Sequence, residues 1–225
     1  MFPKAIVLLS GGLDSTTALY WALRIKKWSC RCLTFDYGQR HRRELRAAKA
    51  VARAARVSVE IVRFSLPWGG SSLLGGGRRL PVHAPERIGK GPIPSTYVPA
   101  RNTIFLSFAS SWTDAIGAEN IVIGANALDY SGYPDCRPAY FKTFQNTARL
   151  GTRLGVEARR PPRVWTPLLR MTKEGIVRLG ASLGAPFEKT WSCYEGGSHP
   201  CGGCDSCVLR TKGFQEARVV DPALR

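Results

Sequence analysis

The sequence has no long hydrophobic run. Residues 5–9 give five apolar residues before Ser10, and no later run comes close to the length of a membrane span. Such a run is shorter than the apolar core of a signal peptide and far shorter than a membrane span. We therefore expect a cytoplasmic protein with no membrane segment. In a reducing compartment the seven cysteines are expected to be metal ligands, catalytic thiols or core residues rather than disulfides.

Acidic residues are scarce. Sixteen Asp and Glu accompany 33 Lys and Arg, so the formal net charge is +17. This charge points to anionic partners such as nucleotides, carboxylates or RNA, and the alternative is a solvated Arg-rich surface. The chain has 225 residues and is 44% hydrophobic, with an ordinary charged fraction of 22%. These values exclude global disorder and indicate one domain, or one domain with an appendage.

Short apolar runs alternate with amphipathic stretches along the chain. We predict strands at 4–9, 32–35, 57–64, 120–123 and 163–166, and helices at 14–27, 39–56, 101–116 and 171–183. This alternation predicts an α/β fold with a doubly wound, parallel, five-stranded sheet covered on both faces. Ligands of such sheets bind beyond the carboxyl ends of the strands. Polar residues follow three of the predicted strands there, at 10–12, 36–38 and 124–126.

One segment lacks any periodicity. Residues 67–99 contain six Pro and seven Gly in 33 positions, and a stretch of this kind is usually a functional loop or disordered. We interpret it as a lid over the site, and the alternative is an inert surface loop. The predicted organisation is an α/β domain over 1–185 that carries this lid, followed by a C-terminal segment over 186–225.

A Gly-rich turn joins the first predicted strand to the first predicted helix. Its sequence is Ser-Gly-Gly-Leu-Asp-Ser at 10–15. Glycines let the backbone approach an anion, and a helix N-terminus offers unpaired N–H groups. The turn lacks the lysine of a Walker A loop and the spacing of a dinucleotide-binding motif. By its chemistry alone it is either an anion cradle or an ordinary helix start.

The string Ser-Gly-Gly-x-Asp-Ser directly after a first strand resembles the pyrophosphate loop of the N-type ATP pyrophosphatases, the PP-loop superfamily with the adenine nucleotide α-hydrolase-like fold. These enzymes cleave ATP between the α and β phosphates and adenylate an oxygen atom. The resemblance implies that the turn binds ATP with Mg²⁺, and that Asp14 helps to place the cation. The implied ATP-binding residues are Leu9, Ser10, Gly11, Gly12, Leu13, Asp14, Ser15, Thr16, Thr17, Ala18 and Leu19.

Four cysteines near the C-terminus have metal-ligand spacing. Cys193, Cys201, Cys204 and Cys207 form a C-x7-C-x2-C-x2-C pattern with glycines between them. Four thiolates suit tetrahedral Zn²⁺, and such a site stabilises an otherwise irregular tail. We predict structural zinc. An iron–sulfur cluster is the alternative, because C-x2-C-x2-C also occurs in ferredoxin-type sites.

Four longer strings narrow the resemblance to one family. They lie at 33–41, 94–103, 126–137 and 191–207, and together they resemble the 7-cyano-7-deazaguanine synthases of queuosine biosynthesis over nearly the whole chain. The segments 67–91 and 149–163 carry no family string. The resemblance implies an ATP-dependent carbon–nitrogen ligase that converts 7-carboxy-7-deazaguanine and ammonia to the nitrile through two adenylated intermediates. It also implies a homodimer.

The resemblance and the local chemistry suggest roles for further residues. Lys173 is expected to reach the phosphates and Arg101 to clamp a phosphate or carboxylate, so that Lys173, Arg101 and Asp14 form the catalytic set. The alternatives are a solvated helix-start lysine and a surface salt bridge. The expected substrate-binding residues, which otherwise form a turn packed by its own tyrosines, are Asn126, Asp129, Tyr130, Tyr133, Asp135 and Arg137.

Two competing functions follow from the same features. A PP-loop enzyme of tRNA thiolation or lysidine formation would suit the charge, with Cys136 as sulfur carrier, but the chain leaves no room for an RNA-binding domain. We therefore expect small-molecule substrates and no nucleic-acid partner. A non-enzymatic zinc module would explain the cysteines but not the Gly-rich turn.

Overall fold

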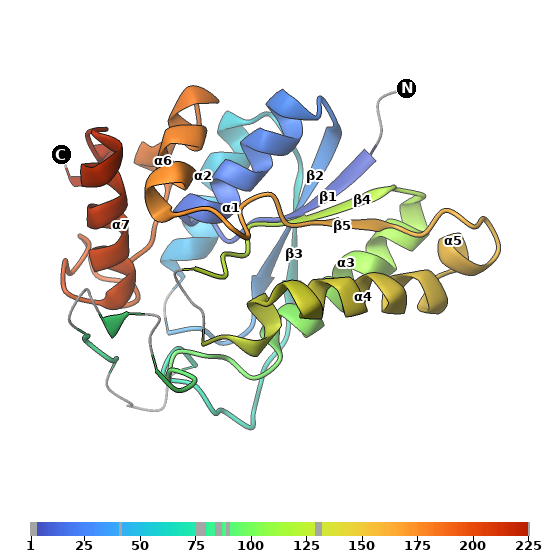
Figure 1. Ribbon diagram of the computed structural model, residues 1–225, viewed down its shortest axis with the longest axis horizontal. Coiled ribbons are helices and arrows are strands. Elements are labelled where there is room, and N and C mark those ends of the chain that lie inside the picture. Colours follow the sequence, from blue (N-terminus) through green and yellow to red (C-terminus); the bar gives the residue numbers. More distant parts are fainter. Residues whose placement is uncertain are drawn as a thin grey trace.

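The computed structural model forms a parallel sheet with helices on both faces (Figure 1). It describes residues 4–40, 42–74, 80–83, 87–88, 91–128 and 132–224. The strand order is β3–β2–β1–β4–β5, and every pairing is parallel. The strands are β1 (Lys4–Leu8), β2 (Ser29–Asp36), β3 (Val59–Arg63), β4 (Asn120–Ile123) and β5 (Arg163–Trp165). The predicted doubly wound sheet of five strands is confirmed, and its strand order reverses between β1 and β4.

Alternate residues of β1 enter two separate cores. Val7 packs with the helices of one face, whereas Ile6 packs with those of the other, and both side chains are fully buried. The first face carries α1 (Leu13–Tyr20), α2 (Arg43–Ala54), α6 (Lys173–Ser182) and α7 (Asp205–Ala217), and the second carries α3 (Arg101–Ile116) and α4 (Pro138–Gly151). A fully buried aliphatic side chain contributes about 1.5–3 kcal/mol. The two cores therefore fix the central strand from both sides.

Several predicted boundaries were wrong. The helix expected at 14–27 ends as α1 at Tyr20 and continues as a π-helical turn, η1 (Trp21–Ile25). The helix expected at 39–56 begins only at Arg43, because Gln39 instead caps the end of β2 by bonding the backbone of Phe35 and Tyr37. The second strand begins three residues earlier than expected, at Ser29.

Three α-helices of the described residues were not predicted. In α4, Pro138 occupies the first turn, where its missing N–H costs nothing, and the buried positions Phe141, Phe144 and Ala148 recur at helical spacing. A short helix, α5 (Arg153–Val156), follows it. In α7, Phe214 and Ala217 enter the same core as β1 and α1. The predicted C-terminal segment thus packs against the α/β domain, and the contact runs mainly between α7 and α6.

The described parts of segment 67–99 contact three other regions. Arg40 donates its backbone N–H to the carbonyl of Leu73, at 3.0 Å. The hydroxyls of Thr96 and Tyr133 lie 2.7 Å apart. His83 donates its backbone N–H to Asp205 at the start of α7, at 3.0 Å. The segment therefore lies across the carboxyl ends of the strands, and its role as a closing lid stays a prediction.

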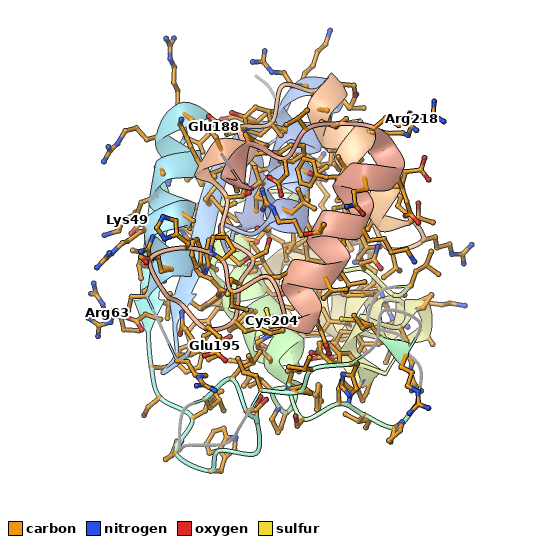
Figure 2. All side chains as sticks on the ribbon, turned by 90° about the vertical axis from the view of Figure 1, so that its left-hand side faces the viewer. Lys49, Arg63, Glu188, Glu195, Cys204 and Arg218 are labelled. Carbon is orange, nitrogen blue, oxygen red and sulfur yellow. The ribbon has the colours of Figure 1, made fainter. Side chains whose placement is uncertain are left out.

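Basic side chains are spread around the periphery. Lys49 and Arg63 point outward at one edge of the molecule and Arg218 at the opposite edge (Figure 2). The surface charge is therefore distributed rather than gathered at one place. Within the described residues, no helix has the length and apolar character needed to cross a bilayer.

Candidate active site

A cavity of about 250 Å³ opens at the carboxyl ends of β1, β2 and β4. Its walls come from the Gly-rich turn, from the loop that follows β2, from the first turns of α3 and α6, and from residues 191–194 of the C-terminal segment. This is the position that strand-order reversal predicts for ligand binding. Five regions distant in sequence therefore build one site.

The Gly-rich turn is fixed by its glycine at position 11. Gly11 has φ +84°, and a Cβ there would lie 2.4 Å from the backbone nitrogen of Ala48 and 2.6 Å from the carbonyl oxygen of Glu44. Only glycine allows both this conformation and this approach to α2. Gly11 also accepts a hydrogen bond from the backbone N–H of Trp191, at 2.9 Å. The turn is thus held between α2 and the C-terminal segment.

The turn leaves its helix-start amides available. Gly12 is the N-cap of α1, and no side chain caps it. Because α1 starts at Leu13, the N–H groups of its first turn have no intrahelical carbonyl to bind. The first helical bond runs from the N–H of Thr16 to the carbonyl of Gly12. These amides and the positive end of the helix dipole form an anion-binding position facing the cavity.

Two serines shape the turn from within. The Ser10 and Ser15 hydroxyls lie 3.0 Å apart, and Ser15 Oγ accepts from the Ser10 backbone N–H at 3.2 Å. Both residues line the cavity. The predicted ATP-binding residues that line it are Leu9, Ser10, Gly12, Leu13, Asp14 and Ser15. Gly11, Thr16, Thr17, Ala18 and Leu19 lie behind this surface, and the hydroxyls of Thr16 and Thr17 have no hydrogen-bond partner among the described residues.

Lys173 and Asp14 form the charged part of the cavity floor. Lys173 Nζ donates to both carboxylate oxygens of Asp14, at 2.7 and 2.8 Å. The lysine side chain is only 10% exposed. Its position depends on Gly213 of α7, where a Cβ would lie 2.4 Å from Lys173 Cγ. The predicted lysine therefore sits in the site, and it is not a solvated surface residue.

Arg101 lies on the opposite wall among aromatic side chains. Its Nη1 lies 3.5 Å from the Tyr37 hydroxyl, and its guanidinium lies 5.9 Å from the Phe105 ring centroid. Phe105 in turn stacks on Phe35 at 3.9 Å. All four residues line the cavity. This wall offers flat apolar surface beside a cation, which suits a planar ring bearing an acidic group.

A further carboxyl group, which was not predicted from the sequence, lies on the same cavity wall as Arg101. Glu44 of α2 is half-buried and lines the cavity. Burial raises its pKa to about 7, although the nearby charge of Arg101 acts in the opposite direction. A carboxyl with this pKa changes protonation near neutral pH.

Cys136 is a buried neutral thiol at the same cavity. Burial, reinforced by the charge of Asp135, raises its pKa to about 11. Asn102 Nδ2 donates to its sulfur at 3.3 Å. Because the thiolate is the nucleophilic form, this environment does not favour sulfur-transfer chemistry at Cys136.

The predicted substrate-binding residues are only partly brought together. Asn126 and Tyr133 line the cavity, and Asn126 Nδ2 donates to the carbonyl of Met171 at 2.7 Å. Asp135 is buried and accepts from the Asn102 backbone N–H at 2.9 Å, which caps α3. Neither Asp135 nor the exposed Arg137 is among the lining residues. Asp129 and Tyr130 lie outside the described residues.

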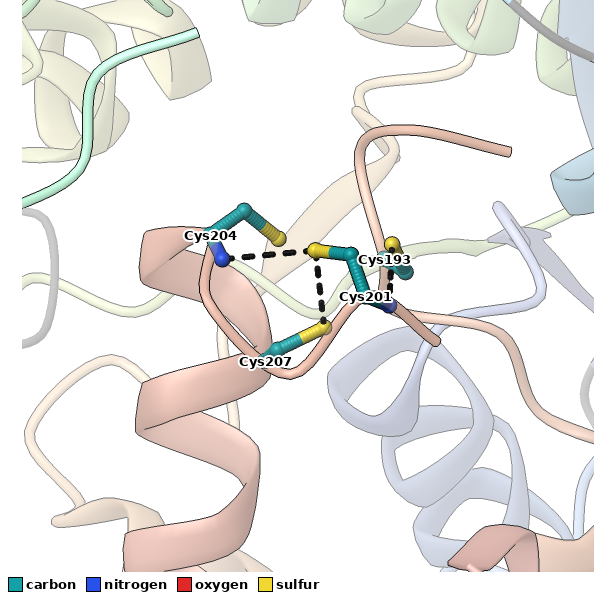
Figure 3. Close-up of side chains that lie close together, drawn as sticks. All are labelled: Cys193, Cys201, Cys204 and Cys207. Carbon is teal, nitrogen blue, oxygen red and sulfur yellow. Dashed lines mark hydrogen bonds between the residues drawn. The ribbon is translucent and has the colours of Figure 1, made fainter. Parts of the chain in front are cut away.

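The four predicted cysteines lie together beside the cavity (Figure 3). The sulfur atoms of Cys193, Cys201, Cys204 and Cys207 are all within 4.8 Å of one another. A tetrahedral zinc site with bonds of about 2.3 Å would bring its sulfurs to about 3.8 Å. Only Cys201 is exposed. The cluster can therefore hold a metal ion after small adjustments of its side chains.

Backbone amides already point at the cluster sulfurs. Cys193 Sγ accepts from the N–H of Cys201 at 3.3 Å and from that of Glu195 at 3.4 Å, and Cys201 Sγ accepts from the N–H of Cys204 at 3.4 Å. Such hydrogen bonds stabilise thiolates around a metal ion. A hydrogen bond from the Cys207 thiol holds the pKa of Cys204 below its usual range. The four sulfur ligands and the backbone amides around them both fit a metal ion bound by thiolates.

The fold and the site together define a PP-loop α/β protein. The matching family model, "Queuosine biosynthesis protein QueC", covers residues 4–218. A 7-cyano-7-deazaguanine synthase from Trichodesmium erythraeum is 52% identical over 98% of this chain and 100% of its own length. One from Thermoplasma acidophilum is 49% identical over 97% of this chain and 90% of its own. The chain belongs to this family of 7-cyano-7-deazaguanine synthases, ligase-type enzymes of queuosine biosynthesis.

A solved structure supports the fold assignment alone. The U34-tRNA thiolase NcsA from Methanococcus maripaludis has a TM-score of 0.50 and 15% identity, over 96% of this chain and 70% of that chain. At this sequence identity the likeness shows the fold, and it says nothing about the substrate of this chain or about an iron–sulfur cluster such as the one in that thiolase. The family resemblance expected from the sequence strings is thus confirmed by the family model and by the near relatives.

Proposed function

We propose that this protein ligates ammonia to 7-carboxy-7-deazaguanine and then dehydrates the amide to 7-cyano-7-deazaguanine, using two molecules of ATP. The observation that carries the proposal is that the anion-binding turn at 10–15 and Lys173, which binds Asp14 of that turn, line one cavity. An in-line displacement at the α-phosphate needs mainly positioning and charge neutralisation. The site supplies both.

The first step activates the carboxylate. One carboxylate oxygen attacks the α-phosphorus of ATP, the bond to the bridging oxygen breaks, and pyrophosphate leaves with that electron pair. The amides of the first turn of α1 bind the departing pyrophosphate, and Lys173 neutralises charge on the phosphates. A bound Mg²⁺ would supply further charge neutralisation, and the carboxylate of Asp14 would hold it.

The later steps join nitrogen to the former carboxyl carbon and then convert this bond into a triple bond. Ammonia attacks the acyl carbon, and AMP leaves to give the amide. The amide oxygen then attacks a second ATP and releases a second pyrophosphate. Loss of AMP and of both nitrogen-bound protons leaves the carbon–nitrogen triple bond. One phosphate-binding turn serves both adenylations, because each places an oxygen nucleophile against the same α-phosphate.

The aromatic wall is the proposed position of the deazaguanine. Phe35 and Phe105 present flat surface there, and Arg101 stands beside them for the substrate carboxylate or a phosphate. Asn126 and Tyr133 offer polar groups to the ring edge. Asp129, Tyr130, Asp135 and Arg137 stay predictions as substrate ligands, since none of them is a described lining residue.

The four cysteines are proposed to hold structural zinc rather than an iron–sulfur cluster. The reaction involves no electron transfer, and the cluster fixes residues 191–194, which form one wall of the cavity. A bound zinc ion supplies folding free energy to this segment. We further propose a cytoplasmic homodimer that acts on small molecules and has no nucleic-acid partner.

Mass spectrometry tests the proposal. The protein is mixed with ATP, Mg²⁺, ammonium and 7-carboxy-7-deazaguanine, and the product mass is recorded with matched reactions lacking ATP or ammonium. The nitrile mass, accompanied by pyrophosphate and AMP, is expected only in the complete mixture. An unchanged acid would contradict the proposed function. Tight, salt-sensitive binding of tRNA would then favour a tRNA-modifying activity.

A further inference from the structure

The proposed reaction needs ammonia as a free base, but ammonium is the dominant species in neutral water and has no lone pair. Some group at the site must therefore take a proton from it. The cavity is lined by two carboxylates among the described residues, Asp14 and Glu44. Asp14 is already bound through both oxygens by Lys173. Glu44 is the remaining carboxylate.

Glu44 lines the cavity between the Gly-rich turn and Arg101. Its backbone carbonyl packs on the Cα of Gly11, so α2 holds it directly against the pyrophosphate-binding turn. Its carboxyl group lies near Arg101, whose charge influences its pKa. It therefore borders both the phosphate position and the proposed carboxylate position, and the bond to nitrogen forms between these two.

Within the described part of the chain, no residue donates a hydrogen bond to the Glu44 carboxylate. An ammonium ion has four N–H donors and a positive charge, and an unpartnered carboxylate beside an apolar ring wall suits it well. A structural salt bridge would instead pair the carboxylate closely with a fixed donor. Glu44 is moreover the single acidic residue between Tyr37 and Arg56.

We propose that Glu44 binds ammonium at the cavity wall and accepts its proton, which releases ammonia for attack on the acyl adenylate. This inference rests on the proposed function. The nitrogen lone pair forms the new bond to the acyl carbon, and the bond from that carbon to the AMP oxygen breaks with its electrons on AMP. One proton goes to Glu44 before attack, and a second leaves nitrogen as the intermediate collapses and passes to solvent.

The protonation behaviour of Glu44 suits this role. Its pKa of about 7 lies near the working pH, where a general base is most effective. The other titratable or charged groups on this side of the cavity are Tyr37 and Arg40 from the loop after β2, Arg101 from α3, Tyr133 and Cys136 from the segment after β4, and Tyr194 from the C-terminal segment. Tyr37, whose burial raises its pKa, stays neutral in this range. Burial likewise raises the pKa of Tyr133 and of Cys136, so these two groups also stay neutral near pH 7.

The test compares Glu44→Gln with Glu60→Gln, which alters an exposed carboxylate on β3 away from the cavity. Three quantities are measured: pyrophosphate release without ammonium, kcat/KM for ammonium against pH, and product formation with hydroxylamine, a nucleophile that is uncharged at neutral pH. Melting temperatures of both variants are recorded alongside.

We expect Glu44→Gln to release pyrophosphate normally while its kcat/KM for ammonium falls by about 10²–10⁴-fold. The wild-type profile should level off above pH 7, whereas the variant should follow free ammonia and keep rising. Hydroxylamine should restore acyl transfer in the variant. Glu60→Gln should match the wild type in all three measurements.

Two results would overturn the inference: an unchanged kcat/KM for ammonium in Glu44→Gln, or an equal loss with ammonium and hydroxylamine, which would indicate a structural role. Absence of pyrophosphate release by the wild-type protein would instead overturn the proposed function, and this inference with it.

Discussion

Lys173 Nζ bridges both carboxylate oxygens of Asp14 and so joins the first turns of two helices, α6 and α1. A lysine at a helix start is unfavourable by itself, because the N-terminus carries partial positive charge. Asp14 compensates in the free protein. When phosphates bind, their negative charge can replace part of the charge of Asp14 in balancing Lys173 and the helix N-terminus. The Lys173–Asp14 pair therefore suits an anion-binding site.

Lys173→Met should abolish adenylation rather than folding. Loss of a cation that stabilises phosphate charge is expected to lower pyrophosphate release by about 10²–10³-fold. The free energy of unfolding should fall by about 1–2 kcal/mol, since Asp14 loses a partner but keeps some contact with water. Stopped-flow pyrophosphate detection and thermal unfolding measure the two effects. Lys189→Met, which breaks only the surface pair with Glu188, should change neither.

Gly213→Ala should also impair adenylation, because it displaces Lys173. The new Cβ would overlap Lys173 Cγ, so the lysine must move away from Asp14. Alanine normally favours a helix by about 1 kcal/mol over glycine, but this overlap should give a net loss of about 1–3 kcal/mol. Gly151→Ala in α4, where the added Cβ meets nothing, is the matched control. A Gly213→Ala protein with wild-type stability and pyrophosphate release would show that Lys173 tolerates displacement.

Cys204→Ser should lose metal and stability together. The substitution removes one of four clustered thiols, and metal binding free energy is folding free energy for such a segment. We expect metal content near zero by elemental analysis and a melting temperature lowered by several degrees; chelation of the wild type should have the same effect. Cys30→Ala, outside the cluster, should retain its metal. Full zinc content and an unchanged melting temperature in Cys204→Ser would contradict the zinc proposal.

Glu44 should make the protein less stable as the pH rises from about 4.5 to 7. Its pKa is about 7 in the folded protein and 4.5 as the ordinary value, so the unfolded chain loses this proton first. The folded state then binds more protons, and the free energy of unfolding decreases across this window. The loss should reach about 2 kcal/mol relative to Glu44→Gln. Urea unfolding of both proteins at pH 4.5 and 8 measures it, and parallel pH dependences would refute the assignment.

The sheet and the Gly-rich turn could be predicted because their signals are local. The apolar run at 4–9 predicts a strand and the turn at 10–15 predicts a helix start, and neither prediction depends on the rest of the chain. The helix α4 was missed although Phe141, Phe144 and Ala148 have helical spacing, because its outer face and the following arginines resemble a surface loop.

The cavity walls could be predicted less well, since they depend on which distant residues meet. The side chain of Glu44 lies in an otherwise basic, amphipathic helix, where a single acid usually forms a surface ion pair. Its role becomes visible only when α2 packs on Gly11 and faces Arg101. Asp135, conversely, was expected at the substrate but caps α3 instead. Only the tertiary fold shows which carboxylate lines the cavity and which one caps a helix.

The hydrogen bond from Trp191 to Gly11 ties the C-terminal segment to the Gly-rich turn, so that shortening the chain affects the site. Residues 191–194 and Arg210 complete the cavity, and Arg210 is itself bound by Asp221 only four residues from the chain end. A version trimmed before Trp191 would retain every strand and the Gly-rich turn but leave one side of the cavity open to bulk water, where the proposed acyl adenylate would hydrolyse. The segment from Trp191 to Asp221 thus closes one side of the cavity, and a shortened chain should retain it.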